Sequence, residues 1–264
     1  MGGTPQPHLF LIGLGVLVPD HITVQATRAL SRCSQVYSLI REPAHLWMPQ
    51  GKSGHIELID VRNWYIEGEV RTRNYDRVAQ AIFEALSPSE SIGYVTYGNP
   101  MTYDSVAQNL IDLTTKAGLS VQVVPGVSSV ETVLCDLRID MAPGIQVVDA
   151  SWFVACRIRP RTDVPLLLIQ VSSFGSLRTH YSKNRDGGSL RELVRYCSEV
   201  YPPDFLVSLV RTGGNDGRSA QIRQVPLSML VDTTGDELSG ASLYIPSSQK
   251  MPADLDVLAR MENI

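Results

Sequence analysis

Three short apolar runs in the first half of the chain each end in a turn that contains glycine. The run and turn pairs are Leu9–Ile12 with Gly13-Leu14-Gly15, Tyr94–Tyr97 with Gly98-Asn99-Pro100, and Val121–Val124 with Pro125-Gly126. Each run has the length and the apolar or β-prone composition of a buried strand. Glycine after a strand permits a tight turn and a close approach of the backbone to a ligand. Because α/β sheets bind ligands at the carboxyl ends of their strands, the turns predict both a fold class and the place of a site.

Helical periodicity fills the intervals between these runs. Apolar side chains recur three and four positions apart over residues 20–33, 71–86 and 104–113. The alternation of strands and helices predicts parallel pairing with helices on both faces of the sheet. Beyond Ser128 the pattern changes, and the S-x-x-E form of Ser128–Glu131 predicts a capped helix to about Leu137. Other expected elements are strands at 36–40, 146–148, 166–171, 205–210 and 241–245, helices at 151–156, 189–200 and 226–231, and loops at 178–188 and 213–217.

The fold class that these elements predict is α/β, with two α/β subdomains. We place the first at residues 1–125 and the second at 126–248, followed by a tail of residues 249–264. A chain of 264 residues has room for one large or two small domains. The tail carries Leu255, Leu258 and Met261 at helical spacing, which leaves a short amphipathic helix and a frayed terminus both open.

Composition narrows the class of protein further. Hydrophobic residues make up 44% of the chain, as in soluble globular proteins, and the net charge of −4 indicates no nucleic-acid or anionic-membrane partner. The four cysteines and five histidines are dispersed without a C-x-x-C pair, so no metal site is expected. Unpaired cysteines and the lack of a signal-like or membrane-spanning segment indicate a cytoplasmic protein.

The three glycine turns, in this order and spacing, resemble those of the tetrapyrrole methylase superfamily. An N-terminal GxG strand end, a central G-D/N/H-P turn and a P-G-V-S-S/A segment recur in that family, and the likeness covers nearly the whole chain. The resemblance implies two α/β domains that bind S-adenosylmethionine in the cleft between them and release S-adenosylhomocysteine.

Longer stretches are similar to one branch of this superfamily, the borosin peptide α-N-methyltransferases. These stretches are "VVPGVSSVETVLCDLRIDMAPGIQVVDASWFVACRIRP", "LLLIQVSSFG", "NWYIEGEVRTRNY" and "ASLYIP". Borosin enzymes methylate backbone amide nitrogens of a ribosomally made peptide. In agreement, the first turn, "IGLGVLVPDHIT", lacks the Gly-Asp-Pro with which ring methylases usually continue.

The resemblance also carries a set of cofactor-binding positions. They are Gly13, Tyr97, Asn99, Pro100, Thr102, Tyr103, Ser128, Ser129, Gln170, Ala241 and Ser242. The residues alone leave structural alternatives open for several of them. Ser128 fits an N-cap, Gln170 a residue that satisfies backbone at a strand end, Gly13 and Pro100 turn residues, and Tyr97 strand core.

Backbone N-methylation requires unusual help, because the amide lone pair is delocalised into the carbonyl. A tyrosine can serve as the base, and a guanidinium can stabilise the developing oxyanion. By resemblance, Tyr65, Arg71 and Tyr75 match the borosin catalytic positions. Spacing alone favours a core tyrosine at 75 and an arginine at a helix start whose charged end reaches solvent, and the resemblance reverses that preference. Arg62 departs from the pattern, since the fungal enzymes carry a further active-site tyrosine there.

Fused borosin proteins continue into a long extension that ends in the peptide to be modified, whereas this sequence stops at Ile264. We therefore expect a separate precursor peptide, as in split borosin systems, bound in trans by a homodimer. Two alternatives stay open. One is a C-methyltransferase of a porphyrin or corrinoid ring, against which the first turn and the Tyr65, Arg71 and Tyr75 set both argue. The other is a non-catalytic cofactor-binding scaffold that recognises a leader peptide, which the missing tyrosine favours.

Overall fold

The computed structural model describes residues 7–49, 56–180, 187–213, 219–249 and 251–262. Two compact units make up the chain. Unit 1 is Met1–Thr132 with Ser176–Lys183 and Gly213–Ser219, and unit 2 is Val133–Gly175, Asn184–Thr212 and Ala220–Ile264. Unit 1 therefore takes in segments that come late in the sequence, which a single boundary near residue 125 does not include.

Unit 1 is built on a parallel sheet with strand order β3-β2-β4-β1-β5. The strands are β1 (Leu9–Gly13), β2 (Gln35–Ser38), β3 (Glu57–Asp60), β4 (Ile92–Thr96) and β5 (Val121–Val124). Every residue of β1 and β4 is buried, as expected at the centre of a parallel sheet that is covered on both faces. The predicted parallel pairing is confirmed. The sequence missed β3, an edge strand whose residues are exposed or half-buried and lack an apolar run.

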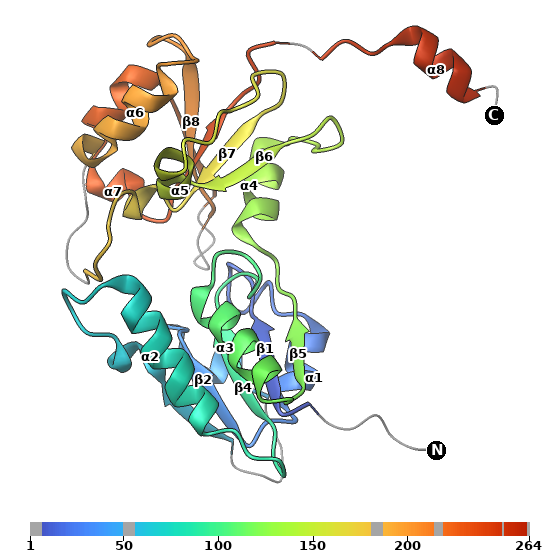
Figure 1. Cartoon of the computed structure of the whole chain (residues 1–264), viewed down its shortest axis with the longest axis vertical. Helices are drawn as coiled ribbons and strands as arrows, with labels where there is room; N and C mark the ends of the chain where they lie inside the picture. Colours follow the sequence, from blue (N-terminus) through green and yellow to red (C-terminus); the bar gives the residue numbers. More distant parts are fainter. Residues whose placement is uncertain (1–6, 50–55, 181–186, 214–218, 250, 263–264) are drawn as a thin grey trace. The chain divides into compact units, whose positions relative to one another are not determined.

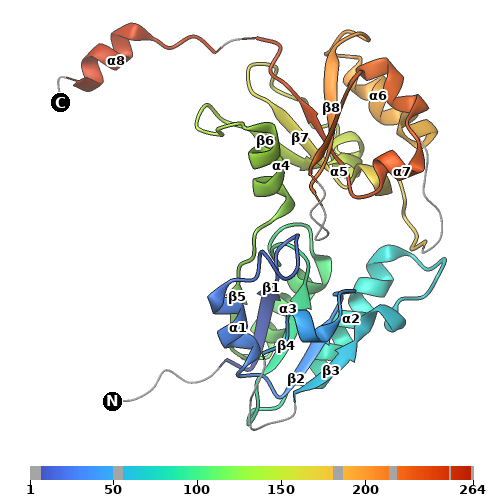
Figure 2. The ribbon, with the colours of Figure 1, turned by 180° about the vertical axis from the view of Figure 1, so that it is seen from behind.

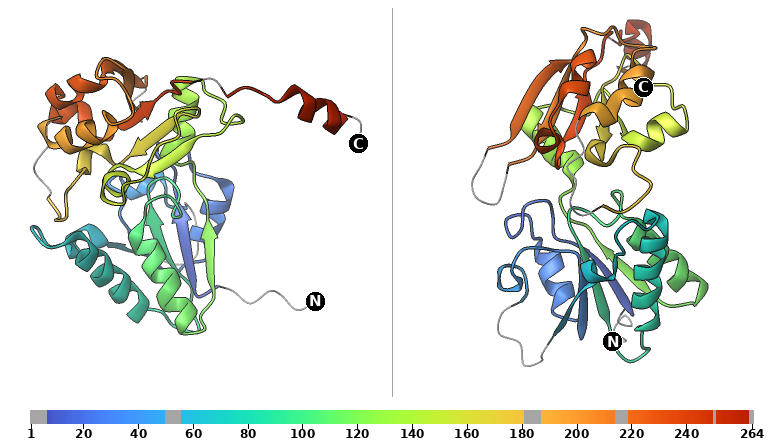
Figure 3. Two further views of the ribbon diagram at one scale, coloured as in Figure 1. Left: turned by 45° about the horizontal axis from the view of Figure 1, so that its top comes forward. Right: turned by 90° about the vertical axis from the view of Figure 1, so that its left-hand side faces the viewer.

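Helices cover both faces of this sheet (Figure 1). Helix α1 (Val24–Leu30) packs on one face, and α2 (Arg71–Glu84) and α3 (Ser105–Lys116) pack together on the other. The view from behind brings α1 to the front, and the right-hand panel of Figure 3 shows the strands between the two helical layers (Figures 2 and 3). Since β1 leads into α1 and its neighbour β4 leads into α3, their carboxyl ends turn toward opposite faces, which marks a switch point in the sheet.

The starts of these helices follow their capping groups. The helical period expected from residue 20 becomes a helix only from Val24, because Thr23 is the N-cap of α1 and its hydroxyl accepts from the Ala26 amide at 3.0 Å. The start of α2 at Arg71 is confirmed. Asp104 caps α3 by accepting from the Ala107 amide at 3.0 Å, so α3 begins one residue later, at Ser105.

Unit 2 holds a mixed sheet with strand order β6-β7-β10-β8-β9. The strands are β6 (Gln146–Asp149), β7 (Leu166–Ile169), β8 (Leu206–Arg211), β9 (Gln221–Pro226) and β10 (Ser242–Ile245). Only the β6–β7 pair is parallel among the pairs described; the others are antiparallel. The predicted strand 166–171 ends early because Gln170 adopts φ 60°. Strand β9 was missed, since four of its six residues are exposed.

The helices of unit 2 are short. They are α5 (Ala150–Ala155), α6 (Arg191–Cys197), α7 (Gly235–Leu238) and α8 (Leu255–Glu262), with α4 (Ser129–Leu137) beginning in unit 1. Single-turn 3₁₀ helices are η1 (Ala44–Leu46) and η2 (Val61–Trp64) in unit 1 and η3 (Val171–Ser173), η4 (Gly187–Leu190) and η5 (Leu227–Asp232) in unit 2. The helix predicted at 226–231 is thus η5, and the one predicted at 189–200 is split between η4 and α6.

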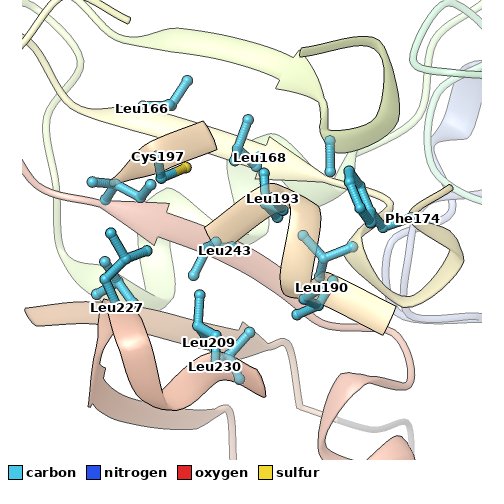
Figure 4. Packing of buried hydrophobic residues seen from close by; sticks show 14 of the residues in the cluster. Leu166, Leu168, Phe174, Leu190, Leu193, Cys197, Leu209, Leu227, Leu230 and Leu243 are labelled. Atoms are coloured by element: carbon cyan, nitrogen blue, oxygen red, sulfur yellow. The ribbon is translucent and has the colours of Figure 1, made fainter. Parts of the chain in front are cut away.

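Leucine side chains fill the core of unit 2 (Figure 4). Leu168 of β7 stands opposite Leu243 of β10, and Leu193 of α6 packs against them. The tail forms the helix that its spacing allowed, α8, with all of its described side chains exposed. In the loop predicted at 178–188, Arg178 pairs with Val70 and the chain turns into η4, while residues 181–186, like 214–217 of the second predicted loop, lie outside the described residues.

Two kinds of feature are absent from the described residues. No described helix is long and apolar enough to cross a membrane. Among the same residues, no group of three or more histidine, cysteine and acidic side chains is arranged to hold a metal ion.

A polar pair fixes the connection from β4 to α3. The Tyr94 hydroxyl donates to the Asp104 carboxylate at 3.0 Å, and the same carboxylate caps α3. Burial raises the pKa of the Asp104 carboxyl and raises that of Tyr94 well above its usual value. The hydrogen bond from Tyr94 opposes the first of these shifts. Tyr94 therefore stabilises a carboxylate that would otherwise be poorly solvated.

Replacing Tyr94 tests this role. We expect Tyr94→Phe to lower the free energy of unfolding by about 1–3 kcal/mol, because the enclosed Asp104 carboxylate loses a donor. Tyr201→Phe is the matched control, since the Tyr201 hydroxyl is buried without a partner among the described residues and its removal costs nothing. Urea denaturation measures both variants. Equal losses in the two would contradict the role given to Tyr94.

Candidate functional site

The three predicted turns meet at the carboxyl ends of β1, β4 and β5. Gly15 and Gly98 exchange backbone hydrogen bonds, from Gly15 N to Gly98 O at 3.2 Å and from Gly98 N to Gly15 O at 2.9 Å. A Cβ on Gly13 or on Gly126 would lie 2.3 Å from the Gly98 carbonyl oxygen. These glycines are therefore required for the turns to approach one another. The sequence analysis had explained them by the approach of the backbone to a ligand.

The turn after β4 presents several side chains at this edge. Its backbone is held by hydrogen bonds from Thr102 N to Asn99 O at 2.8 Å and from Met101 N to Asn99 Oδ1 at 2.9 Å. Gly98 and Tyr103 adopt positive φ values of 64° and 61°. Tyr103 and Met101 are exposed. The turn is thus a rigid frame that leaves aromatic and apolar surface uncovered.

Ser128 serves as a helix cap. Its hydroxyl accepts from the Val130 amide at 3.1 Å, and the Glu131 carboxylate accepts from the Ser128 amide at 2.9 Å. The Ser128 hydroxyl also donates to Glu131. The structure therefore bears out the N-cap alternative for Ser128, and of the expected capping box it shows the bond from the Ser128 amide to Glu131. Ser129 begins α4 and is half-buried.

The three positions expected in unit 2 come together within that unit. Gln170 directly follows β7, and Ser242 begins β10, next to Ala241. The antiparallel register that sets Leu243 against Leu168 places Ala241 opposite Gln170 when it is continued. Gln170 is exposed, and its side-chain oxygen accepts from the Ser173 hydroxyl at 3.3 Å.

A large open pocket lies beside the turn after β4, within unit 1. Its volume is about 1010 Å³, and its lining residues are Leu39, Arg41, Asp60, Arg62, Asn63, Tyr65, Tyr75 and Tyr97. Two of the three residues expected to be catalytic thus share a cavity with a residue expected to bind the cofactor.

Tyr75 contacts both Arg71 and Tyr65. Arg71 Nε donates to the Tyr75 hydroxyl at 3.0 Å, across one turn of α2. The Tyr65 and Tyr75 rings meet edge to face, with centroids 6.2 Å apart and planes at 73°. All three side chains are half-buried, so each has one side on the core and one side open.

Tyr97 is tied to the loop after β2. Its hydroxyl donates to the Glu42 carboxylate at 2.5 Å and accepts from the Arg41 amide at 2.7 Å. Burial, followed by the hydrogen bond to Glu42, raises the pKa of Tyr97 to about 12. Tyr97 therefore keeps its proton at neutral pH. The sequence analysis missed Arg41 and Glu42, because no local pattern connects them with Tyr97, which follows them by 56 and 55 positions along the chain.

Arg62 lines the pocket in a fixed pose. Its Nε and one terminal nitrogen donate to the two oxygens of Asp60 at 2.8 and 2.6 Å, and its amide donates to the same carboxylate at 2.9 Å. The side-chain hydrogen bond lowers the pKa of Asp60 and raises that of Arg62. The guanidinium of Arg62 is thus paired with a carboxylate at the pocket wall. Asp60 could have been found from the D-x-R spacing before η2.

Comparison with known proteins identifies the family. The chain matches the model of the tetrapyrrole (corrin/porphyrin) methylases over residues 8–228, and it belongs to that family of S-adenosylmethionine-dependent methyltransferases. The predicted resemblance and the two-unit α/β fold are confirmed.

The curated relatives are borosin proteins. The methyltransferase/ribosomally synthesized type I borosin cyclic peptide precursor of Cerrena unicolor is 21% identical, over 99% of this chain and 64% of its own length. The methyltransferase/omphalotin A precursor of Omphalotus olearius is 23% identical, over 98% of this chain and 62% of its own length. The chain therefore spans less than two thirds of these relatives.

Solved structures show the same fold. The methyltransferase CobJ has a TM-score of 0.61 at 12% identity, covering 94% of this chain and 98% of its own. A uroporphyrin-III C-methyltransferase from Thermus thermophilus complexed with S-adenosyl homocysteine has a TM-score of 0.57 at 16% identity, covering 89% of this chain and 95% of its own. At these identities the likeness establishes the fold alone.

The contact between the turns can be tested at Gly13. We expect Gly13→Ala to lower the free energy of unfolding by about 1–3 kcal/mol, because the added methyl overlaps the Gly98 carbonyl and forces the turns apart. Gly93→Ala is the control on the neighbouring strand, where the nearest atom to the new Cβ is the Cys33 sulfur at 3.1 Å, a side chain that can yield. Urea denaturation measures both variants. A loss at Gly13 no larger than the loss at Gly93 would contradict the steric requirement.

Proposed function

We propose that this chain is a methyltransferase that N-methylates backbone amides of a ribosomal precursor peptide supplied in trans. The observation that carries the proposal is the contact set in the unit 1 pocket, where Tyr65 and Tyr75 meet and Arg71 donates to Tyr75. The borosin relatives, whose names join a methyltransferase to a peptide precursor, support a peptide as the substrate.

The residues at the strand ends fit S-adenosylmethionine. The fixed turn after β4 offers the Thr102 hydroxyl and the exposed side chains of Tyr103 and Met101, which suit the polar and apolar parts of a nucleoside carrying a thioether chain. We propose that all eleven positions named from the resemblance bind the cofactor. Gln170, Ala241 and Ser242 belong to unit 2, and the others belong to unit 1. When bound, S-adenosylmethionine supplies an electrophilic methyl group on a sulfonium.

The protein's own groups must remove a proton and stabilise charge. In the proposed mechanism Tyr75, or Tyr65 beside it, acts as a phenolate, whose oxygen takes the proton of the amide nitrogen and becomes a neutral phenol. Arg71 uses Nε to hold Tyr75, and its side chain makes no other hydrogen bond or ion pair within the described part of the chain. Its terminal nitrogens are therefore available to the amide oxygen, where negative charge develops.

Tyr97 is a poor candidate for the base. Its hydroxyl already donates to Glu42, and its pKa of about 12 means that deprotonation is unfavourable at neutral pH. The proton transfer is thereby assigned to Tyr65 and Tyr75. We give Tyr97 the role of a wall residue that joins the pocket to the turn after β4.

The proposal includes a homodimer and a cytoplasmic location. None of the four cysteines forms a disulfide bond, which supports a reducing compartment. Size-exclusion chromatography with light scattering determines the oligomeric state.

Methylation of a precursor peptide tests the proposal. The peptide encoded beside the gene, incubated with the protein and S-adenosylmethionine, should gain mass in steps of one methylene, as read by mass spectrometry. We expect Tyr75→Phe and Arg71→Lys each to lower the rate about 10²-fold or more, because the base and the oxyanion donor are lost. Tyr201→Phe should leave the rate unchanged, and calorimetry should show S-adenosylhomocysteine bound by all variants.

Other outcomes would refute the peptide proposal. Bound S-adenosylhomocysteine and bound peptide without any mass gain in the unmodified protein would indicate a scaffold. A change in visible absorbance with a porphyrin precursor, and none in peptide mass, would indicate a ring C-methyltransferase.

Arg62 should govern peptide binding more than chemistry. It lines the same pocket as Tyr75, but its guanidinium is held by Asp60 and takes no part in the hydrogen bond between Arg71 and Tyr75. We expect Arg62→Tyr to change the KM for the peptide roughly three- to tenfold, as a contact of ~1 kcal/mol would, with kcat within about twofold. The control is Arg73→Ala, which removes an exposed arginine of α2 that pairs with Glu69. A loss confined to kcat would contradict this role.

A further inference from the structure

A late segment of the chain is paired with the loop that precedes α2. Thr179 N donates to Glu69 O, Gly68 N donates to Thr179 O, and Arg71 N donates to Leu177 O, each at 2.9 Å. This segment, residues 177–180, lies beside the start of α2 in unit 1 (Figure 1). The first amides of a helix have no partner within it, and the Val70 N-cap makes no side-chain bond. The Leu177 carbonyl thus completes the helix end that carries Arg71.

Asn74 joins this segment to the loop that carries Tyr65. Its side chain is fully buried. Its Oδ1 accepts from Ile66 N at 2.9 Å and from Arg77 at 2.5 Å, while its Nδ2 donates to Ile66 O at 2.9 Å and to the Thr179 hydroxyl at 2.8 Å. An amide side chain can donate twice and accept twice. Asn74 therefore uses its whole capacity to hold backbone and side chains on both sides of α2's first turn.

These bonds fix the distances among the three residues proposed for catalysis. Ile66, gripped at both its amide and its carbonyl, directly follows Tyr65. Asn74 directly precedes Tyr75. The edge-to-face contact of Tyr65 and Tyr75 is therefore bracketed by hydrogen bonds from a single buried amide.

Burial alone would favour another residue at position 74. The side chain lies on the inner side of α2, where Val78 and Ile82 are buried, and an aliphatic residue there would avoid the desolvation of an amide. The amide is stable in this place because all four of its bonds are made. What it adds over an aliphatic residue is a defined position for the Ile66 backbone.

We propose that Asn74 and Thr179 are positioning residues for the Tyr65, Arg71 and Tyr75 cluster. Asn74 sets the Tyr65 loop against α2, and the Thr179 hydroxyl sets the orientation of the Asn74 amide. The catalytic consequence rests on the proposed function, whereas the effect on the tyrosine geometry does not.

The test uses a matched series at position 179. Thr179→Val removes the hydroxyl at constant shape, Thr179→Ser keeps it, and Thr72→Val makes the same change at an exposed site on α2. We expect Thr179→Val to lower kcat for the precursor peptide about tenfold, with the KM for S-adenosylmethionine within about twofold. Thr179→Ser should recover the rate to within about twofold, and Thr72→Val should not change it. Asn74→Ala should lower kcat further.

A second measurement needs no substrate. In protein labelled with ¹³C at the tyrosine ring, the resonances of Tyr65 and Tyr75, assigned from Tyr→Phe variants, should shift in Thr179→Val and Asn74→Ala. They should stay in place in Thr72→Val and return in Thr179→Ser. Unmoved resonances would overturn the proposal, whatever the activity. If the wild-type chain methylates no peptide but the tyrosine resonances move in the variants as described, the proposed function fails and the positioning role stands.

The pattern of kinetic loss separates positioning from stability. Thermal denaturation is measured for each variant. If Thr179→Ser loses as much activity as Thr179→Val, or if the losses follow the melting temperature alone, the hydroxyl has no positioning role and the proposal fails.

Discussion

A steric requirement at the carboxyl edge of the unit 1 sheet underlies the rest of the structure. The Gly98 carbonyl oxygen occupies the space that a side chain would need at Gly13 and at Gly126. Three turns that are distant in sequence therefore contact one another directly. This contact sets where β4 ends, and the end of β4 places both the turn to Tyr103 and the pocket wall at Tyr97.

Buried polar side chains fix the positions of the elements at that edge. Asp104 caps α3 and is held by Tyr94, and Asn74 holds the Tyr65 loop to α2. A buried polar group without partners destabilises a fold, but one with all its bonds made has a single favourable position. The pocket is thus bounded by residues whose positions are set by hydrogen bonds as well as by packing. The Tyr97 hydroxyl is likewise held by Glu42, and for this reason we assign Tyr97 to the pocket wall and not to the role of base.

Local sequence patterns predicted much of this architecture. The apolar period over 71–86 predicted α2 to within two residues of its end, and the strand runs before the glycine turns predicted β1, β4 and β5. Edge strands β3 and β9 escaped prediction because their exposed faces lack an apolar signal. The Tyr65, Arg71 and Tyr75 set came from a family likeness, since spacing alone favoured an ordinary helix start. Glu42, Asn74 and Thr179 could not be found, because their partners are joined only by the folded chain.

The pairing of residues 177–180 with the loop before α2 also orders events during synthesis. More than 100 residues separate Asn74 from Thr179 along the chain. A nascent polypeptide can form β1 to β5 and even the glycine contacts long before the ribosome has made Thr179. Until that segment has emerged and docked, the start of α2 lacks its carbonyl partner and the Tyr65 loop lacks its anchor. The cluster is thus assembled late in biosynthesis, after the first sheet is in place.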